Sequence, residues 1–354
     1  MFVLDSHCDT PSQIHRLHDI SIDGEHSQVD FPKLKKGGVD GAFFAIYTPA
    51  SKSSDEAYDY ACSLLDETKS AVAASSEAAA LAMSPGDAYA NKARGLFSVF
   101  LGMENGSPIG RDLSRLSEFY DKGVRYMTLC HSADNEICDS CASVSSRWNG
   151  LSPFGKEVVA EMNRLGMLID VSHISDKSFY DVLEYSSNPV VATHSCCRAL
   201  ADHPRNMTDG MIRALASTGG VIQINFYPVF LDSAFAATLD ESGIADWGEA
   251  IEDEFIRDPA SASKRAAWFG VLDRLEALQR PSYKRIADHI DHVVSLVGID
   301  HVGLGSDFDG IAVTPDGLEN VSCFHRIFDE LRLRGYTETE LCKIASDNFF
   351  RLFS

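Results

Sequence analysis

The sequence lacks any apolar run that approaches the ~18 residues of a membrane-spanning helix, and its apolar start, residues 1–4, is too short for the hydrophobic region of a signal peptide. Basic residues are also scarce, since 31 Lys and Arg stand against 52 Asp and Glu, a formal net charge of −21. A field of that sign repels phosphate backbones and anionic lipid. We therefore expect a cytosolic (cytoplasmic) protein that binds neither nucleic acid nor a membrane surface.

The sequence also lacks the cysteine patterns of disulfide and zinc sites and the glycine motif of a dinucleotide-binding fold. The nine cysteines are odd in number and scattered, which does not fit a secreted disulfide framework. Cys138 and Cys141 form a CxxC in the loop-like stretch NEICDSCAS, but no second CxxC completes a zinc site, so we interpret the pair as incidental. No GxGxxG follows the first strand-like run, which argues against a dinucleotide-binding fold.

What the sequence does contain is a large hydrophobic fraction arranged in short runs. With 354 residues and 45% hydrophobic content, the chain can bury a large core. Eight apolar, β-branched runs end in polar or glycine residues and predict eight strands. They cover residues 2–9, 39–47, 96–106, 124–131, 167–173, 189–195, 220–227 and 301–310.

Helical periodicities separate most of these strands. Residues 152–165 begin with Ser-Pro and stop at Gly166, as expected of a capped helix. Strands that alternate with helices predict right-handed βαβ units and a parallel sheet, and eight units favour closure into a (β/α)₈ TIM barrel. An open doubly wound sheet is the alternative. The other predicted helices are 55–82, 112–122, 176–186, 208–217, 283–297 and 337–352.

One stretch interrupts the alternation. Residues 228–280 are acidic and partly helical, and they lie between the seventh strand and its helix. This insertion falls on the face where a barrel carries its active site. We predict one catalytic domain over residues 1–354, in which 228–280 is a lid, a subunit contact or a tolerated surface excursion.

Side chains that could bind a metal or transfer a proton stand at the ends of the predicted strands. In HCDT, His7 and Asp9 are two positions apart, so on a strand they point to the same side. A lone histidine at a strand end is usually structural, but all strand ends of a barrel converge on one mouth. His289 and His292 are set aside as surface residues of an outer helix. The residues at the mouth are His7, Asp9, Glu104, His131, His173, His194 and Asp307, with Arg205 in the loop after the sixth strand.

This residue set predicts a metal centre. Imidazole and carboxylate ligands without a thiolate cluster suit Zn²⁺, or less readily Mn²⁺, Fe²⁺ or Co²⁺. These candidate ligands exceed what a single zinc with an open position requires, and two metals that share a carboxylate fit better. Glu104, in GMEN, is the only glutamate at the mouth and can bridge through its two oxygens.

The chain resembles the membrane dipeptidase (renal dipeptidase) family, binuclear zinc peptidases of the amidohydrolase-like superfamily. The motifs that carry the resemblance cover nearly the whole barrel: DSHCDTP, GMENG, GVRYMTLCHS, GLSPFGKEVVAEMNRLGMLIDVSH, VVATHS, HPRN and GSDFDG. A His-x-Asp on the first strand and a bridging glutamate are the features that favour this family within the superfamily. The resemblance also suggests a homodimer.

The resemblance further implies a role for each residue. His7, Asp9 and Glu104 would hold one Zn²⁺, and Glu104, His173 and His194 the second. His131 would contact the substrate near its scissile carbonyl. Arg205 would bind the C-terminal carboxylate, Asp307 would act as acid/base, and Tyr227 would contact the substrate. Two positions depart from the family pattern: Asn105 stands where a glycine is expected, and His203-Pro204 precedes the arginine, which puts the conformation of that loop in question.

The implied activity is a zinc-dependent dipeptidase that hydrolyses the peptide bond of dipeptides with a hydroxide shared by the two metals. Arg205 would restrict substrates to short peptides that end just past the scissile bond. The same centre could instead hydrolyse another amide, a β-lactam or a lactone, because fold and metal do not fix the substrate. The alternative outside the enzymes is a catalytically silent barrel that serves as a binding module.

Overall fold

The computed structural model describes residues 1–353, in which eight parallel strands form a nearly closed barrel. The order around the barrel is β1-β2-β4-β5-β6-β7-β8-β9, and each strand pairs in parallel with the next. This confirms the predicted (β/α)₈ fold. The strands are β1 (Leu4–Cys8), β2 (Gly41–Tyr47), β4 (Phe97–Glu104), β5 (Val124–Thr128), β6 (Leu168–Asp170), β7 (Val191–Ser195), β8 (Val221–Ile224) and β9 (Val302–Leu304).

The barrel closes between its first and last strands without a regular ladder. Cys8 bridges Phe308 in parallel, and the Asp9 N–H donates to the Phe308 carbonyl at 2.8 Å. The Asp307 N–H donates to the His7 carbonyl at 2.9 Å. The residues that close the seam are therefore neighbours of candidate site residues.

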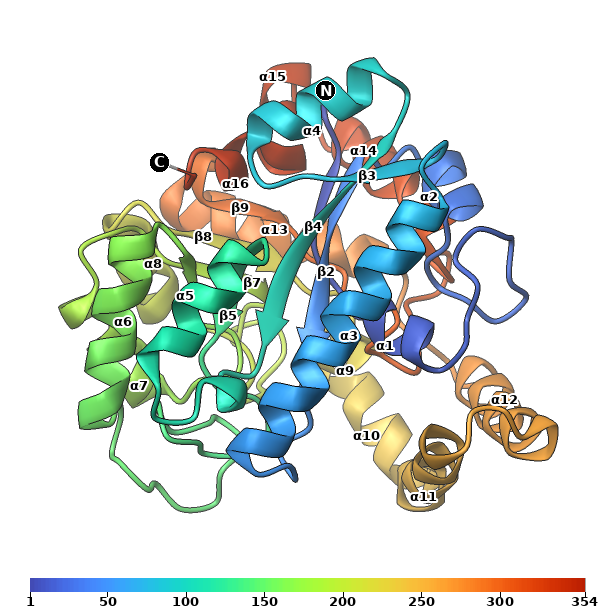
Figure 1. Cartoon of the computed structure of the whole chain (residues 1–354). Coiled ribbons are helices and arrows are strands. Elements are labelled where there is room, and N and C mark those ends of the chain that lie inside the picture. Colours follow the sequence, from blue (N-terminus) through green and yellow to red (C-terminus); the bar gives the residue numbers. More distant parts are fainter. Residues whose placement is uncertain (354) are drawn as a thin grey trace.

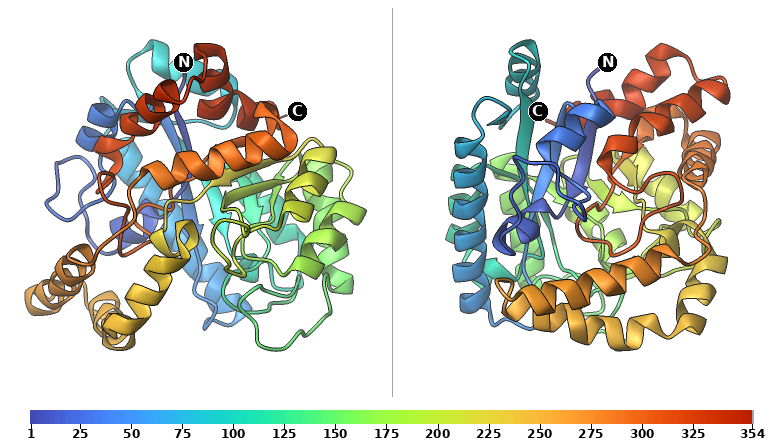
Figure 2. Two further views of the ribbon diagram at one scale, coloured as in Figure 1. Left: turned by 180° about the vertical axis from the view of Figure 1, so that it is seen from behind. Right: turned by 90° about the vertical axis from the view of Figure 1, so that its right-hand side faces the viewer.

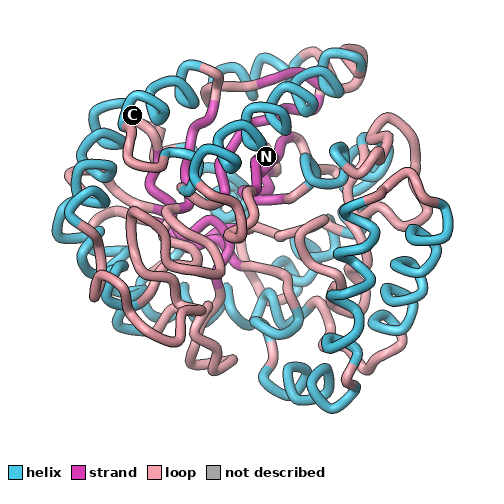
Figure 3. Tube along the Cα trace, turned by 60° about the horizontal axis from the view of Figure 1, so that its bottom comes forward, coloured by secondary structure: helices cyan, strands magenta, loops and turns pink. Residues whose placement is uncertain are grey.

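Helices surround the strands (Figures 1 and 3), and most of the predicted ones are present. The cap predicted at residues 152–165 is confirmed, because Ser152 Oγ accepts from the Gly155 N–H at 2.8 Å and Gly166 is left-handed at φ 74°. The longer helices around the barrel are α2 (Phe31–Gly37), α3 (Ser54–Ala74), α4 (Pro85–Ala93), α5 (Leu113–Asp121), α6 (Pro153–Leu165), α7 (Asp176–Tyr185), α8 (Asp209–Ser217), α13 (Lys284–Val297) and α14 (His325–Leu333).

Shorter segments complete the helical layer. They are α1 (Thr10–His15), α15 (Glu338–Cys342), a π-helical turn (Lys343–Asp347), α16 (Asn348–Phe350), and the 3₁₀ turns Ser107–Ile109, Ile299–His301 and Val321–Cys323. The predicted helix 337–352 thus consists of α15, the π turn and α16.

The predicted helix 55–82 is too long. Helix α3 ends at Ala74, and Ala79–Leu81 forms a ninth strand, β3, which pairs with the first half of β4. The alanine-rich sequence favours a helix, but residues 79–81 gain backbone hydrogen bonds on the edge that β5 leaves free. Helices α1, α2, α4 and α14 were not predicted.

Strand residues alternate between two cores. In β2, Phe43 packs inside the barrel, whereas Phe44 faces the surrounding helices. Phe349 and Phe350 of α16 pack into the same inner cluster as Phe43. Aromatic rings thus fill the interior at the amino ends of the strands, and the polar mouth lies at the other end.

The insertion 228–280 is helical over most of its length. It contains α9 (Pro228–Leu231), α10 (Ser233–Ser242), α11 (Ile244–Arg257) and α12 (Ala262–Glu276). In Figures 1 and 2 these helices lie at the end toward which the arrowheads of β2 and β4 point, whereas the N-terminus lies at the opposite end. The insertion therefore projects from the mouth of the barrel.

Candidate metal centre

Glu104, the last residue of β4, lies among four histidines. Its Oε1 is 3.1 Å from His173 Nε2, 3.4 Å from His194 Nε2 and 3.7 Å from His131 Nε2. Its Oε2 is 3.7 Å from His7 Nε2. The structure thus brings together residues from four separate strand ends around one carboxylate.

A second group of acids flanks His7. Its Nε2 lies 3.5 Å from Asp9 Oδ2 and 4.0 Å from Asp307 Oδ1. Gly310 packs directly against these carboxylates, since a Cβ atom there would lie 2.2 Å from Asp9 Oδ2 and 2.9 Å from Asp307 Oδ1. Only a residue without a side chain allows the backbone to approach both acids so closely.

The donor atoms form three overlapping groups that could each hold a cation, with the atoms of a group within 4.8 Å of one another. All of these residues are buried or nearly so. Buried imidazole and carboxylate donors that converge in this way suit a divalent transition metal. The groups are His7, Glu104 and His194; Glu104, His131 and His173; and His7, Asp9 and Asp307.

Three residues of the centre or its edge adopt left-handed backbone conformations. They are Asn105 (φ 77°), His173 (φ 68°) and Asp307 (φ 65°). Asparagine tolerates this region better than most residues, which explains why it can stand where a glycine was expected. Asn105 also donates from Nδ2 to the Thr48 carbonyl at 2.9 Å. Asparagine in place of the expected glycine therefore stabilises this turn.

Polar neighbours orient two of the histidines. Tyr126 Oη lies 2.7 Å from His7 Nδ1, and Thr193 Oγ1 lies 2.8 Å from His194 Nδ1. Thr193 Oγ1 in turn donates to Asp170 Oδ2 at 2.7 Å. With Nδ1 engaged, each ring presents Nε2 to the centre. These partners were not predicted, although a carboxylate inside the apolar run MLIDVSH is a signal that could have identified Asp170.

Burial controls the charge of these groups. Burial, followed by the charge of Arg205, lowers the pKa of His131 to about 4 and that of His173 well below its usual value. Burial also lowers the pKa of His194. For His7, burial acts in the same direction, but Glu104 and Asp9 outweigh it and raise the pKa. Three of the four imidazoles are therefore neutral, the form that binds metals.

Arg205 lies beside this cluster, with 7% of its surface exposed. Its Nη2 donates to the His194 carbonyl at 2.9 Å and its Nη1 to Ser195 Oγ at 3.1 Å. Within residues 1–353, its Nε has no hydrogen-bond partner. The preceding His203 stabilises the loop, because its Nδ1 accepts from the Arg205 N–H at 3.1 Å. The unexpected His203-Pro204 sequence thus supports the position of the arginine.

Asp307 is connected to Tyr227 through an asparagine. Asn225 Nδ2 donates to Asp307 Oδ2 at 2.8 Å, and Asn225 Oδ1 accepts from the Tyr227 N–H at 2.6 Å. Burial raises the pKa of Asp307 to about 6. Burial, followed by the charge of Asp307, raises the pKa of Tyr227 to about 12. A carboxyl group with such a pKa can both accept and return a proton near neutral pH.

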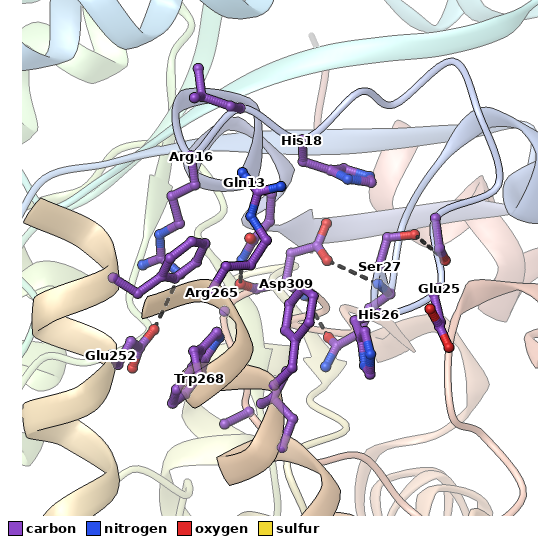
Figure 4. A pocket seen from close by; sticks show the side chains of 18 of the residues that line it. Gln13, Arg16, His18, Glu25, His26, Ser27, Glu252, Arg265, Trp268 and Asp309 are labelled. Atoms are coloured by element: carbon purple, nitrogen blue, oxygen red, sulfur yellow. Dashed lines mark hydrogen bonds and ion pairs between the residues drawn. The ribbon is translucent and has the colours of Figure 1, made fainter. Parts of the chain in front are cut away.

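A polar cavity of about 360 Å³ adjoins the centre (Figure 4). It lies between the loop after α1 and the helices α11 and α12 of the insertion. Arg16 Nη1 crosses its edge to Glu252 Oε1 at 3.2 Å, and Asp309 in its wall accepts from Thr10 Oγ1 at 2.8 Å. The insertion is thereby connected to the segment that follows the first strand.

The prediction that His289 is a surface residue is wrong. Its side chain in α13 is fully buried. The Cys197 N–H donates to His289 Nδ1 at 3.1 Å, and His289 Nε2 lies 3.1 Å from the Leu231 carbonyl. His289 therefore joins the loop after β7 to helix α9. His292, one turn later, is half-buried and pairs with Asp209 at 2.8 Å.

Cys138 is buried and Cys141 half-buried, and both are free thiols. Over the part of the chain that the structure describes, no helix is both long and apolar enough to cross a membrane.

The chain matches the family model described as "Membrane dipeptidase (Peptidase family M19)" over residues 1–354. It is 30% identical to an uncharacterized dipeptidase of Schizosaccharomyces pombe, with 99% of this chain and 80% of the relative covered. The probable dipeptidase PvdM from Pseudomonas aeruginosa has a similar structure, with a TM-score of 0.85, 29% identity and coverage of 100% of this chain and 94% of that one.

A metallopeptidase from Rhodobacter sphaeroides, solved with a phosphinate mimic of the dipeptide L-Ala-D-Ala, has a TM-score of 0.80 and 25% identity. That comparison covers 100% of this chain and 98% of the other. Family model, sequence relative and solved structures therefore agree over the full barrel. The chain belongs to the membrane dipeptidase family, peptidase family M19.

Proposed function

We propose that the chain is a zinc-dependent dipeptidase that holds two Zn²⁺ ions and hydrolyses the peptide bond of dipeptides. The observation that carries this proposal is the convergence of four imidazoles on the Glu104 carboxylate beside Asp9 and Asp307. Family membership and the dipeptide mimic bound by the Rhodobacter sphaeroides relative support the choice of substrate.

The residues present fit a pair of divalent ions. His7 Nε2 is buried and has no hydrogen-bond partner within residues 1–353, which is costly for a ring nitrogen unless a ligand occupies that side. His7, Asp9 and Glu104 would hold one ion, and Glu104, His173 and His194 the other. Such ions, when bound, lower the pKa of a shared water toward ~7 and polarise the scissile carbonyl.

The chain's own side chains would position the substrate. Arg205 carries a buried positive charge within reach of the histidines, and a guanidinium pairs well with a carboxylate. It would bind the C-terminal carboxylate of the dipeptide. His131, whose Nδ1 has no partner among the described residues, would donate to the carbonyl oxygen as negative charge develops there.

Asp307 would transfer the proton. Its Oδ2 accepts from Asn225 Nδ2, which fixes the carboxyl group and leaves Oδ1 toward His7. It would take a proton from the attacking water and deliver it to the departing amine. Tyr227, held by the same asparagine, would contact the substrate beside it.

The test is turnover of a dipeptide library by the zinc-loaded protein, with the chelator-treated protein as control. We expect hydrolysis of free dipeptides that chelation abolishes. Arg205→Ala should raise KM much more for a free dipeptide than for its C-terminal amide, because only the former offers a carboxylate. Turnover of β-lactams or lactones but of no dipeptide would contradict the substrate assignment, and bound metal without hydrolysis of any of these compounds would indicate a binding module.

A further inference from the structure

The insertion has a hydrophobic core of its own, which packs against a few residues of the barrel. Its buried residues come from α10, α11 and α12, and one residue, Val313, comes from the loop after β9. Tyr227 and Ala312 pack against this core from the barrel side. Tyr227, Ala312 and Val313 therefore mark the contact between the insertion and the barrel.

An apolar cavity of about 200 Å³ lies at this contact between the insertion and the barrel. Glu249 and Glu252 are the charged residues among those that line it. Protein interiors contain few voids larger than a water molecule, and an apolar wall offers water no hydrogen-bond partners. A cavity of this kind suits an apolar ligand group. Its apolar walls are formed by Tyr227, Leu239, Ile244, Val271, Leu275 and Val313.

Tyr227 connects this cavity to the centre. On one side it lines the cavity, and through Asn225 it is joined to Asp307. Its ring also meets the ring of Phe230 edge to face at 4.9 Å, and the Arg205 guanidinium lies 5.5 Å from the centroid of the Phe230 ring. Tyr227 thus stands between the cavity and the two groups proposed to handle the C-terminal residue of the substrate.

We propose that the cavity is the subsite for the side chain of the C-terminal residue of the dipeptide, and that it selects apolar side chains such as Leu and Phe. This proposal rests on the proposed function. With its carboxylate on Arg205, the C-terminal residue lies beside Phe230 and Tyr227, and its side chain reaches the cavity past Tyr227. Each additional buried methylene favours binding, whereas the carboxylate of Glu249 repels an acidic side chain.

The larger polar cavity is a poorer candidate. It shares Trp268, Glu252 and Ala312 with the apolar cavity, so these residues lie between the two spaces. Trp268 and Glu252 are labelled in the wall of the polar cavity in Figure 4. Two of its acidic groups already have partners, since Glu252 pairs with Arg16 and Asp309 accepts from Thr10. An apolar side chain there would displace water from paired charges, at a cost in free energy.

Gly248 allows the apolar cavity to be filled from α11. It lies among the residues that line the cavity, and an added Cβ would come 3.1 Å from Val271 Cγ1. Gly270 in α12 is the matched control, because an added Cβ there meets nothing within 4 Å. Both changes place a leucine in a helix of the insertion, where leucine is favoured over glycine.

The experiment measures kcat/KM for Ala-Gly, Ala-Leu, Ala-Phe and Ala-Asp with the zinc-loaded protein. Wild type should prefer Ala-Leu and Ala-Phe over Ala-Gly by about tenfold or more, and Ala-Asp should be the poorest substrate. Gly248→Leu should reduce the ratio of Ala-Leu to Ala-Gly by about tenfold, and Gly270→Leu should keep the wild-type ratio. Leu275→Phe, which adds volume to the same cavity from α12, should act as Gly248→Leu does.

Two results overturn the subsite in different ways. Efficient hydrolysis of Ala-Gly without a preference for Ala-Leu, or an unchanged ratio in both cavity-filling variants, refutes the subsite and leaves the dipeptidase proposal intact. No hydrolysis of any dipeptide by the metal-loaded wild type refutes the proposed function itself and the subsite with it.

Discussion

His173 Nε2 and His194 Nε2 lie 2.9 Å apart, and both are within 3.4 Å of Glu104 Oε1. Burial lowers the pKa of both rings, so both are neutral. Thr193 Oγ1 also lies within hydrogen-bond distance of His194 Nδ1. Two neutral rings and a carboxylate that face one point form a set of electron-pair donors, and a cation at that point would stabilise all three.

Glu104→Gln should weaken binding of both metal ions, because a neutral amide cannot bridge as a carboxylate does. Titration with Zn²⁺, followed by elemental analysis, should find fewer than two ions per chain after dialysis. Glu118→Gln, which changes a carboxylate of α5 that pairs with Lys122, is the control and should keep the wild-type content. Loss of a single ion with full retention of the other would contradict the bridging role.

Tyr126→Phe should reduce metal affinity about ten- to a hundredfold, because it removes the hydroxyl at His7 Nδ1. The ring itself remains and continues to fill the barrel interior, where a Cβ on Gly102 would lie 2.2 Å from it. Competition with a chelator measures the affinity. Tyr89→Phe, at a ring that is 49% exposed, is the control. Equal affinities of the Tyr126 variant and wild type would mean that the hydroxyl does not orient the ligand.

Asp307→Asn should keep both metal ions and lower kcat by about 10²–10⁴, the range expected when a general acid/base is removed. The asparagine can still accept from Asn225 through its Oδ1 but cannot take up the proton. Asp300→Asn, at an exposed residue that pairs with Lys343, should leave kcat unchanged. A full kcat, or inactivity that coincides with metal loss, would refute the assignment.

Asp309 is not a suitable control for that experiment. Thr10 Oγ1 donates to its Oδ2 at 2.8 Å, and the Gln28 N–H donates to its Oδ1 at 3.2 Å. These contacts tie the loop after β9 to the segment after β1. A change at Asp309 would therefore affect the structure of the mouth as well as its charge.

His289→Gln should flatten the dependence of stability on pH. Burial lowers the pKa of His289 to about 4, below the ~6.5 of an unfolded histidine. The unfolded state therefore binds a proton first as pH falls, so stability is present above about pH 6.5 and is lost as pH falls toward 4. Linkage gives a loss of about 2 kcal/mol between pH 7 and pH 5 from this group.

Urea unfolding at the two pH values measures this difference. The variant should be less stable than wild type at pH 7, by about 1–3 kcal/mol, because a buried hydrogen-bond network is disturbed. Its further loss at pH 5 should be smaller than that of wild type by the amount given above. His325→Gln, at an exposed residue of α14, is the control, and identical pH slopes for the His289 variant and wild type would contradict the prediction.

The barrel could be predicted from the sequence because each strand is an apolar run and the runs alternate with capped helices. Strand β3 could not, because residues 79–81 are alanine-rich and become a strand only where β4 leaves its edge open. The burial of His289 was missed for a related reason. Helical spacing placed it on an outer helix, but only the tertiary structure brings Leu231 and Cys197 against that face.

The convergence of His7, Glu104 and His173 could be predicted once a barrel was assumed, because strand ends meet at one mouth. Their partners Tyr126, Thr193 and Asn225 could not, since nothing in the sequence gives the direction of a hydroxyl or amide across the barrel. The roles of the site residues, the second metal ion, the homodimer and the cytosolic location remain predictions.

The closure between the first and last strands has a consequence for synthesis on the ribosome. The Asp9 N–H donates to the Phe308 carbonyl across 299 positions of the chain. At ~5–20 residues per second, the first strand waits roughly 15–60 s for its partner. During that interval the nascent chain carries an unpaired strand edge together with the imidazole of His7 and the carboxylate of Asp9. A cell that makes this protein must therefore keep that edge from other chains until the last strand emerges.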